Sequence, residues 1–126
     1  MRTTADILAA AKSVKPFIGC LSTDQKNHAI ATMADSLLAA EKEILDANLL
    51  DLNAARGTVS DVMLDRLSLT HERLTAMADG MRAVAALPDP VGRVLDRHVR
   101  ENGLTIEKTS VPMGVVAIIY ESRPNV

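Results

Sequence analysis

The chain has 126 residues, a formal net charge of −2, and 48% hydrophobic and 24% charged residues, a composition that allows one modest aliphatic core. Its basic residues are dispersed and its aromatic residues are Phe17 and Tyr120 alone, so nucleic-acid binding is not expected, and its apolar stretches are too short for a membrane span. Because Cys20 is its one cysteine and a signal-peptide pattern is absent, we expect a cytoplasmic protein without an internal disulfide.

Helices are predicted over the first two-thirds of the chain. The first covers residues 7–14 and is expected to end near Lys15, because Pro16 disfavours the helical conformation of the residue before it. A second, long helix is predicted from an N-cap at Thr23 to a point before Gly57. Charged residues at 41–43 interrupt its apolar spacing, and we expect a bend there.

Two shorter helices follow. Ser60 is expected to cap one that runs through Leu67, and Thr70 to cap a longer one. Apolar residues at helical spacing predict the buried stripe of the longer helix: Leu74, Met77, Ala78, Met81, Val84 and Ala85.

Beyond Pro88-Asp89-Pro90 the sequence predicts strands. Residues 91–100 and 104–111 are expected to pair as a polar hairpin around Asn102-Gly103. The uncharged, β-branched run from Gly114 to Tyr120 then predicts a strand buried on both faces, as in a parallel sheet. Such a strand needs partners joined by crossover connections, which do not follow here. The fold class expected is therefore an incomplete α/β one.

The polar turn Glu121-Ser122-Arg123-Pro124-Asn125 is the candidate site. Open α/β sheets bind ligands just beyond the carboxyl ends of their strands. Arg123 offers a planar fork for a phosphate or carboxylate, and Asn125 an amide that can steady an oxyanion. The alternative is a plain β-to-α turn in which Asn125 caps the next helix. A Gly-rich phosphate fingerprint does not follow the run, so this pattern by itself does not indicate a dinucleotide site.

Metal or nucleophilic chemistry elsewhere is not expected. Cys20 has apolar neighbours and no nearby histidine, which is typical of an inert cysteine. His28, His71 and His98 lack the spacing of metal ligands.

Three stretches of this sequence resemble the gamma-glutamyl phosphate reductase (glutamate-5-semialdehyde dehydrogenase) family of the aldehyde dehydrogenase superfamily. They are Val111-Pro112-x-Gly114-Val115-Val116-x-x-Ile119-Tyr120-Glu121-x-Arg123-Pro124-Asn125-Val126, Met63-Leu64-Asp65-Arg66-Leu67-x-Leu69-Thr70 and Asp89-Pro90-Val91-Gly92. The Tyr-Glu-x-Arg-Pro-Asn-Val ending is specific to this family, since broader aldehyde dehydrogenases usually carry Pro-Trp-Asn in the equivalent region.

The resemblance implies an aldehyde dehydrogenase-like α/β fold of which this chain is the amino-terminal part. Residues 1–90 would form a helical segment, residues 91–111 a hairpin that contributes to oligomerisation, and residues 112–126 the incomplete start of the dinucleotide-binding sheet. It also implies a cytoplasmic, homo-oligomeric oxidoreductase of proline biosynthesis. Such an enzyme uses NADPH to reduce L-glutamyl 5-phosphate to L-glutamate 5-semialdehyde.

The site residues follow from the same resemblance. Asn125 would cradle the reacting oxygen and bind substrate, with Arg123 as a substrate-binding residue or as the occupant of that oxyanion position instead. Tyr120, Glu121 and Ser122 would line the NADP cleft, and no metal is implied. The family's nucleophilic cysteine lies beyond residue 126, so the chain alone is expected to be inactive. The alternative is a non-catalytic helical interaction module or a pseudoenzyme fragment.

Overall fold

The computed structural model describes residues 2–120 and Pro124. The chain forms two compact units. We call Asp24–Leu87 with Ile118–Val126 the helical unit, and Met1–Thr23 with Pro88–Ala117 the hairpin unit. The predicted domain division at residues 90 and 111 stays a prediction.

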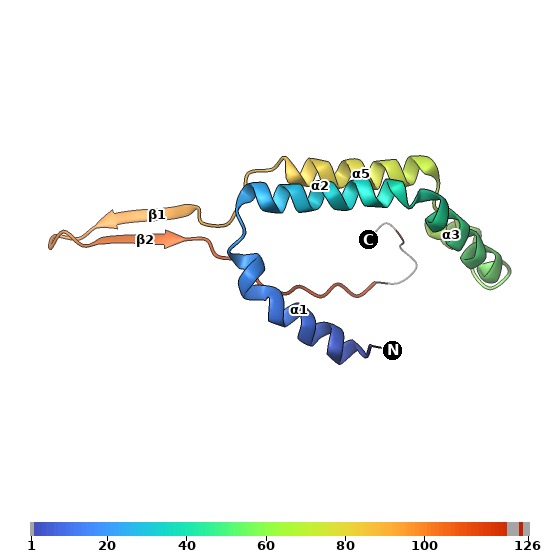
Figure 1. Cartoon of the computed structure of the whole chain (residues 1–126), viewed down its shortest axis with the longest axis horizontal. Helices are drawn as coiled ribbons and strands as arrows, with labels where there is room; N and C mark the ends of the chain where they lie inside the picture. The colour runs from blue at the N-terminus through green and yellow to red at the C-terminus, as the bar shows by residue number, and fades with distance from the viewer. Residues whose placement is uncertain (1, 121–123, 125–126) are drawn as a thin grey trace. The chain divides into compact units, whose positions relative to one another are not determined.

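The helical unit is built on α2 (Thr23–Ala39), α3 (Glu41–Ala55), α4 (Asp61–Leu67) and α5 (His71–Ala85). Helices α2 and α5 lie side by side (Figure 1), and Arg82 Nη2 of α5 donates to Asp35 Oδ1 of α2 at 2.8 Å. The fully buried apolar residues among those described lie on these two helices: Ala34, Leu74 and Ala78. These buried side chains are small or aliphatic, as expected for a core built from a sequence with few aromatic residues.

The predicted bend in the long helix is confirmed and lies at Ala40, between α2 and α3. Ala40 has φ −91° and ψ 9°. Hydrogen bonds of helical type continue on both sides of it, from the Ala40 amide to the Ser36 carbonyl at 3.1 Å and from the Ile44 amide to the Ala40 carbonyl at 3.0 Å. Two helical main-chain bonds therefore continue across the change of direction. Helix α3 ends at Ala55, before Gly57 as predicted.

Both predicted caps of the shorter helices are confirmed. Ser60 Oγ accepts from the Met63 amide at 3.4 Å, and Thr70 Oγ1 accepts from the Arg73 amide at 3.2 Å. Each hydroxyl satisfies one amide that the first turn of a helix leaves without a partner. The predicted buried stripe of α5 is confirmed at Leu74 and Ala78, whereas Met77, Met81 and Ala85 are half-buried and Val84 is 56% exposed.

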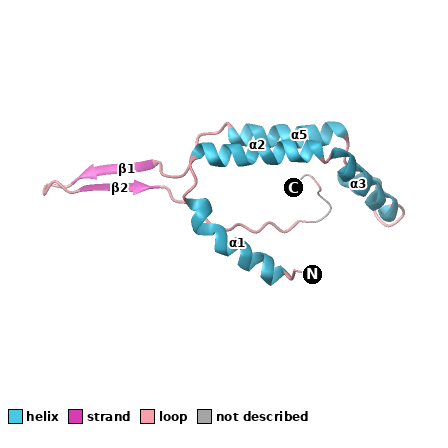
Figure 2. Ribbon diagram, viewed as in Figure 1, coloured by secondary structure: helices cyan, strands magenta, loops and turns pink. Residues whose placement is uncertain are grey.

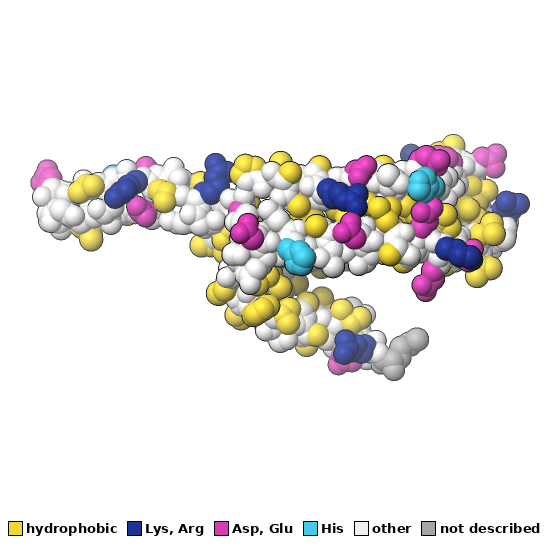
Figure 3. Space-filling view, turned by 45° about the horizontal axis from the view of Figure 1, so that its top comes forward, with side chains coloured by type: hydrophobic (Ala, Val, Ile, Leu, Met, Phe, Trp, Pro, Cys, Tyr) yellow, Lys and Arg dark blue, Asp and Glu magenta, His cyan; other side chains and the backbone are white. Residues whose placement is uncertain are grey.

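Helix α1 (Thr4–Gly19) of the hairpin unit corrects the prediction of an end near Lys15. Pro16 lies inside the helix. A proline removes one amide donor, and here the turn continues through it to a cap at Cys20, whose amide donates to the Phe17 carbonyl at 3.1 Å. The preference of a residue before proline for extended backbone is therefore overridden. The described residues of α1 are not buried, and its hydrophobic side chains lie open on the surface (Figure 3).

The predicted hairpin is confirmed as β1 (Val94–Val99) and β2 (Thr105–Thr109), which pair antiparallel. Across it, Arg97 Nε lies 3.3 Å from Glu107 Oε1, a cross-strand ion pair. At the turn, the Gly103 amide donates to the Arg100 carbonyl and the Arg100 amide to the Leu104 carbonyl, both at 2.9 Å. Gly103 has φ +82°, the left-handed position that a three-residue hairpin loop gives to glycine.

The Asp89-Pro90-Val91-Gly92 motif forms the base of this hairpin. Asp89 Oδ1 accepts from the Val91 amide and Asp89 Oδ2 from Thr23 Oγ1, each at 2.9 Å. The Gly92 amide donates to the Ser110 carbonyl at 3.0 Å, and Ser110 Oγ donates to the Pro90 carbonyl. This motif therefore has a structural role: it holds the two sides of the hairpin base together and bonds that base to Thr23.

The buried strand predicted over residues 114–120 is not formed, which corrects that prediction. Residues 110–120 have no strand structure and are drawn as loop in Figure 2. Their apolar side chains are exposed, with Met113 at 90% and Ile119 at 98%. The sheet of the described residues contains β1 and β2 alone. A strand of a parallel sheet takes all its main-chain bonds from other strands, and none lies beside this segment.

Candidate functional site

The sequence-predicted turn is described at two points. Tyr120 is 56% exposed, and Pro124 lies in the helical unit, where it lines a groove. Glu121, Ser122, Arg123 and Asn125 lie outside the described residues. The candidate site is therefore built from the groove that Pro124 reaches.

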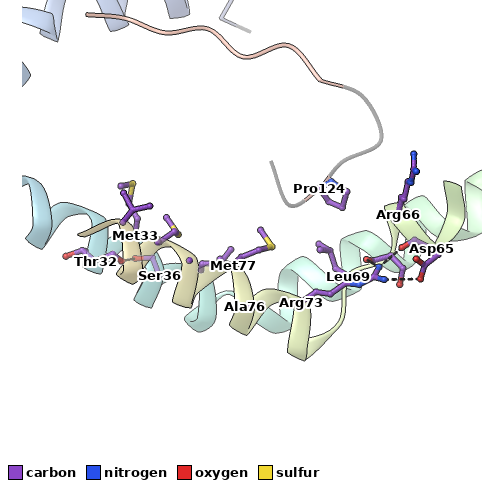
Figure 4. Close-up of a pocket in the computed structure, with 15 residues that line it drawn as sticks. Thr32, Met33, Ser36, Asp65, Arg66, Leu69, Arg73, Ala76, Met77 and Pro124 are labelled. Carbon is purple, nitrogen blue, oxygen red and sulfur yellow. Dashed lines mark hydrogen bonds and ion pairs between the residues drawn. The ribbon is translucent and has the colours of Figure 1, made fainter. Parts of the chain in front are cut away.

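This groove has a volume of about 1270 Å³ and runs along α2 and α5 to the end of α4 (Figure 4). Its apolar side chains come from both long helices and from Leu69 between α4 and α5. Asp65, Arg66 and Arg73 give one end of it charge. The apolar lining comprises Met33, Leu37, Leu69, Ala76, Met77, Met81, Val84 and Pro124. An apolar groove with a few charged groups at one end is the usual form of a site for a small molecule or a peptide.

Arg73 joins α4 to α5 at this charged end. Its Nη2 donates to Asp65 Oδ1 at 2.9 Å and its Nη1 to the Ser68 carbonyl at 2.6 Å. Nη1 also donates to the Asp65 carbonyl. The guanidinium thus satisfies carbonyls that the end of α4 leaves without helical partners. Because these contacts occupy its fork, Arg73 is a structural residue rather than a ligand group.

Asn48 is a buried polar residue that the sequence analysis did not single out. It is 6% exposed, and its Nδ2 donates to the Leu67 carbonyl at 2.9 Å while its Oδ1 accepts from the Leu69 amide at 2.8 Å. Both main-chain groups lie in the connection between α4 and α5. An available signal was its spacing, since Asn48 lies four residues from Ile44 and from Leu52 on the apolar face of α3. A polar residue in such a stripe needs a partner, and here it positions Leu69 in the groove.

His71 and Glu41 form a pair that joins the first turns of α5 and α3. His71 Nδ1 lies 2.9 Å from Glu41 Oε1. The hydrogen bond with Glu41 and the negative charge of that carboxylate raise the pKa of His71 above its ordinary value. Both side chains reach solvent, and the groove is not lined by either of them. We therefore assign this pair a structural role.

The expectations of no metal site and of an inert Cys20 stay predictions for residues 2–120 and Pro124. No group of three histidine, cysteine or acidic residues in that part of the chain is placed to hold a metal ion. Cys20 is exposed at the end of α1. In the same described residues, no helix is both long and apolar enough to cross a bilayer.

Comparison with known proteins was made at the level of families, sequences and structures. No protein-family model matches the chain. It is 55% identical over 126 residues to the gamma-glutamyl phosphate reductase of Neisseria gonorrhoeae, covering 100% of this chain and 30% of that protein. It is 57% identical over 115 residues to the enzyme of that name from Streptococcus pneumoniae, covering 91% of this chain and 27% of that protein. The chain thus spans about 30% of the length of these curated relatives.

Two solved structures of gamma-glutamyl phosphate reductases share its fold. The Thermotoga maritima enzyme matches with a TM-score of 0.89 and 41% identity, over 91% of this chain and 28% of that chain. The Saccharomyces cerevisiae enzyme matches with a TM-score of 0.88 and 30% identity, over 99% of this chain and 32% of that chain. The resemblance and the fold class predicted from the motifs are confirmed: over its whole length, the chain is a homologue of part of gamma-glutamyl phosphate reductase.

Proposed function

We propose that this chain works as part of a longer oxidoreductase that reduces L-glutamyl 5-phosphate to L-glutamate 5-semialdehyde with NADPH, in proline biosynthesis. The observation that carries the proposal is the 55% identity over all 126 residues to a protein named gamma-glutamyl phosphate reductase. The TM-score of 0.89 to a second such enzyme supports it, because the shared fold would give the same residues the same places.

The reacting end of the substrate is assigned to Arg123 and Asn125. The Asn125 amide would stabilise the oxygen that gains charge as the acyl group reacts, and the Arg123 guanidinium would bind the phosphate. Arg123 taking the oxyanion position is the alternative. Pro124 lies between these two residues in sequence and lines the groove. This supports the proposal that the reaction takes place near the groove.

The cofactor-binding assignment rests on Tyr120, Glu121 and Ser122. Tyr120 is the described member of the set, and with 56% of its surface exposed its ring is open to a flat ligand. NADPH would supply the hydride. The residues of this chain would contribute binding and orientation, because the nucleophilic cysteine is proposed to lie outside it.

We also propose that the enzyme is cytoplasmic and homo-oligomeric, because of the same similarity to gamma-glutamyl phosphate reductases. The β1–β2 hairpin is the segment proposed for subunit contacts. The apolar side chains of β1 are exposed, with Val94 at 52%, Leu95 at 58% and Val99 at 63%. Exposed apolar residues on a two-stranded hairpin are suited to pairing with another subunit.

A chimeric enzyme tests the proposal. This chain would replace the 126 matching residues of the Neisseria gonorrhoeae reductase, and NADPH formation from glutamate semialdehyde, phosphate and NADP would be recorded. We expect turnover comparable to the parent enzyme, and no NADPH from the 126-residue chain alone. In the chimera, Asn125→Ala should lower kcat by about 100-fold, as loss of an oxyanion donor does.

Two results would count against the proposal. A folded chimera without turnover would favour the alternative of a non-catalytic helical interaction module. Turnover by the isolated chain would instead show that this chain contains a catalytic nucleophile. Circular dichroism and gel filtration of the chimera against the parent enzyme separate loss of activity from loss of folding.

A further inference from the structure

The charged end of the groove contains an arginine, Arg66, that is exposed and forms no ion pair or hydrogen bond within the described part of the chain. Arg66 lies in the last turn of α4 and lines the groove together with Pro124. In Figure 4 it extends from α4 on the side where Pro124 lies. Its guanidinium makes no ion pair or hydrogen bond with the residues that the structure describes, whereas Arg73 beside it is held by Asp65 and Ser68.

The immediate surroundings of Arg66 decide which anion suits it. Asp65 precedes it and also lines the groove. Arg73 Nη2 bonds Asp65 Oδ1 at 2.9 Å, and Asp65 Oδ2 has no hydrogen bond within the described part of the chain. This carboxylate weakens the attraction of Arg66 for a free phosphate dianion. An α-amino acid has one negative and one positive group on the same carbon, and neighbouring arginine and aspartate side chains match both of them.

The groove next to this pair suits the rest of such a molecule. Leu69 and Met77 line it with apolar surface, which fits the methylene groups between the two ends of a glutamyl chain. The buried Asn48 fixes Leu69 through its main-chain amide at 2.8 Å, so this wall is rigid. Pro124, which Arg123 and Asn125 flank in sequence, lines the same groove.

We propose that Arg66 is a specificity-determining residue that binds the α-carboxylate of the glutamyl substrate, with Asp65 facing its α-ammonium group. The inference rests on the proposed function, which supplies the substrate, and goes beyond it by naming the residues that recognise the end remote from the reaction. Arg66 thereby favours acyl phosphates and aldehydes that carry an α-amino acid group over those of similar length that lack it.

The kinetics of the chimeric enzyme test this assignment. In the direction that forms NADPH, the KM for glutamate semialdehyde, for phosphate and for NADP are measured separately. Arg66→Gln should raise the KM for the semialdehyde by about 10- to 100-fold, the range expected when a charged hydrogen-bonding group is lost. The KM for phosphate and for NADP, and kcat, should change less than about twofold. Arg66→Lys should restore part of the loss, because it keeps the charge but not the planar fork.

The matched control is Arg56→Gln, an exposed arginine after α3 that does not line the groove, and it should leave all three KM values unchanged. An active Arg66→Gln chimera with an unchanged semialdehyde KM would overturn the inference but not the proposed function. A rise in the phosphate KM alone would overturn it too, because Arg66 would then serve the reacting end. An inactive unsubstituted chimera would count against the proposed function instead.

A binding measurement on the 126-residue chain decides the inference without turnover. The Nε–Hε signals of its arginines would be followed by NMR during titration with L-glutamate and, separately, with inorganic phosphate. We expect millimolar L-glutamate to shift the Arg66 signal while phosphate at the same concentration does not. An Arg66 signal that ignores L-glutamate, or that responds equally to both, overturns the assignment.

Discussion

Apolar side chains in the α2–α5 pair and in the segment after the hairpin reach opposite extremes of burial. In the pair, Ala34, Leu74 and Ala78 are fully buried. In residues 111–120, Met113 and Ile119 are 90% and 98% exposed, and no strand forms. A helix makes its main-chain hydrogen bonds within its own segment and then needs one apolar neighbour. A strand of a parallel sheet needs other strands for every one of those bonds.

This difference indicates which parts of the fold this chain completes by itself. The helical unit has local caps at Ser60 and Thr70, a bend at Ala40 that two helical hydrogen bonds flank, and a small core. The exposed run has the sequence of a sheet core without its neighbours. If this is right, truncations of similar size should lower the free energy of unfolding strongly in the α2–α5 pair and weakly in residues 111–120.

The largest effect is expected from Leu74→Ala. Leu74 of α5 is fully buried, so its truncation to alanine removes apolar contacts and leaves a cavity. We expect the free energy of unfolding of the 126-residue chain to fall by about 2–5 kcal/mol, measured by urea denaturation.

Ile119→Ala removes a similar amount of apolar surface from a side chain that is 98% exposed. It should change the unfolding free energy by less than about 0.5 kcal/mol. Equal losses for the two variants would mean that residues 111–120 are buried when the chain folds, and the comparison would fail.

Sequence reasoning succeeded where structure is decided locally. The caps at Ser60 and Thr70, the end of α3 before Gly57 and the hairpin at Asn102-Gly103 each depend on the chemistry of a few neighbouring residues. It failed at Pro16, where a local preference was overridden, and at residues 114–120, where the outcome depends on partners far away in sequence. The groove could not be predicted, because residues far apart in sequence line it. That Arg66 is unpaired among the described residues could not be predicted either, because it depends on Arg73 forming the ion pair with Asp65.

A smaller loss is expected at the buried amide that joins α3 to the α4–α5 connection. Asn48→Leu keeps the volume but leaves the Leu67 carbonyl and the Leu69 amide without their partners. We expect a loss of about 1–3 kcal/mol. Hydrogen exchange of the Leu69 amide should also become much faster than that of Leu74, whose amide donates within α5 to the Thr70 carbonyl.

Asn53→Leu is the matched control for this change, because Asn53 is an exposed residue of the same helix. It should leave both the unfolding free energy and the exchange of Leu69 nearly unchanged. A neutral Asn48→Leu would show that water replaces the lost partners and that the connection is not closed.

Two glycines give changes of opposite sign, each about 1 kcal/mol or less. Gly80 lies in α5 with open space where a Cβ would be, so Gly80→Ala should raise the unfolding free energy by about 0.5–1 kcal/mol. Gly114 has φ +103°, and a Cβ there would lie 3.1 Å from Lys15 Cε. Gly114→Ala should therefore be destabilising. Thermal melts of both variants check the signs of the two changes. A stabilising Gly114→Ala would mean that residue 114 does not keep this positive φ.

The smallest expected effect is a pH dependence from His71 and Glu41. The hydrogen bond with Glu41, its charge and, to a lesser extent, the charge of Glu72 raise the pKa of His71 above the ordinary 6.5. A raised pKa in the folded state means that this contribution to stability is complete below the unfolded pKa and disappears as the pH rises through the folded one. Glu41→Gln should return the NMR titration of His71 toward its ordinary value, and Glu43→Gln in the same turn of α3 should not. An unchanged His71 titration in Glu41→Gln would place the origin of the shift in Glu72 and the first turn of α5, and the His71–Glu41 pair would then not link α3 to α5.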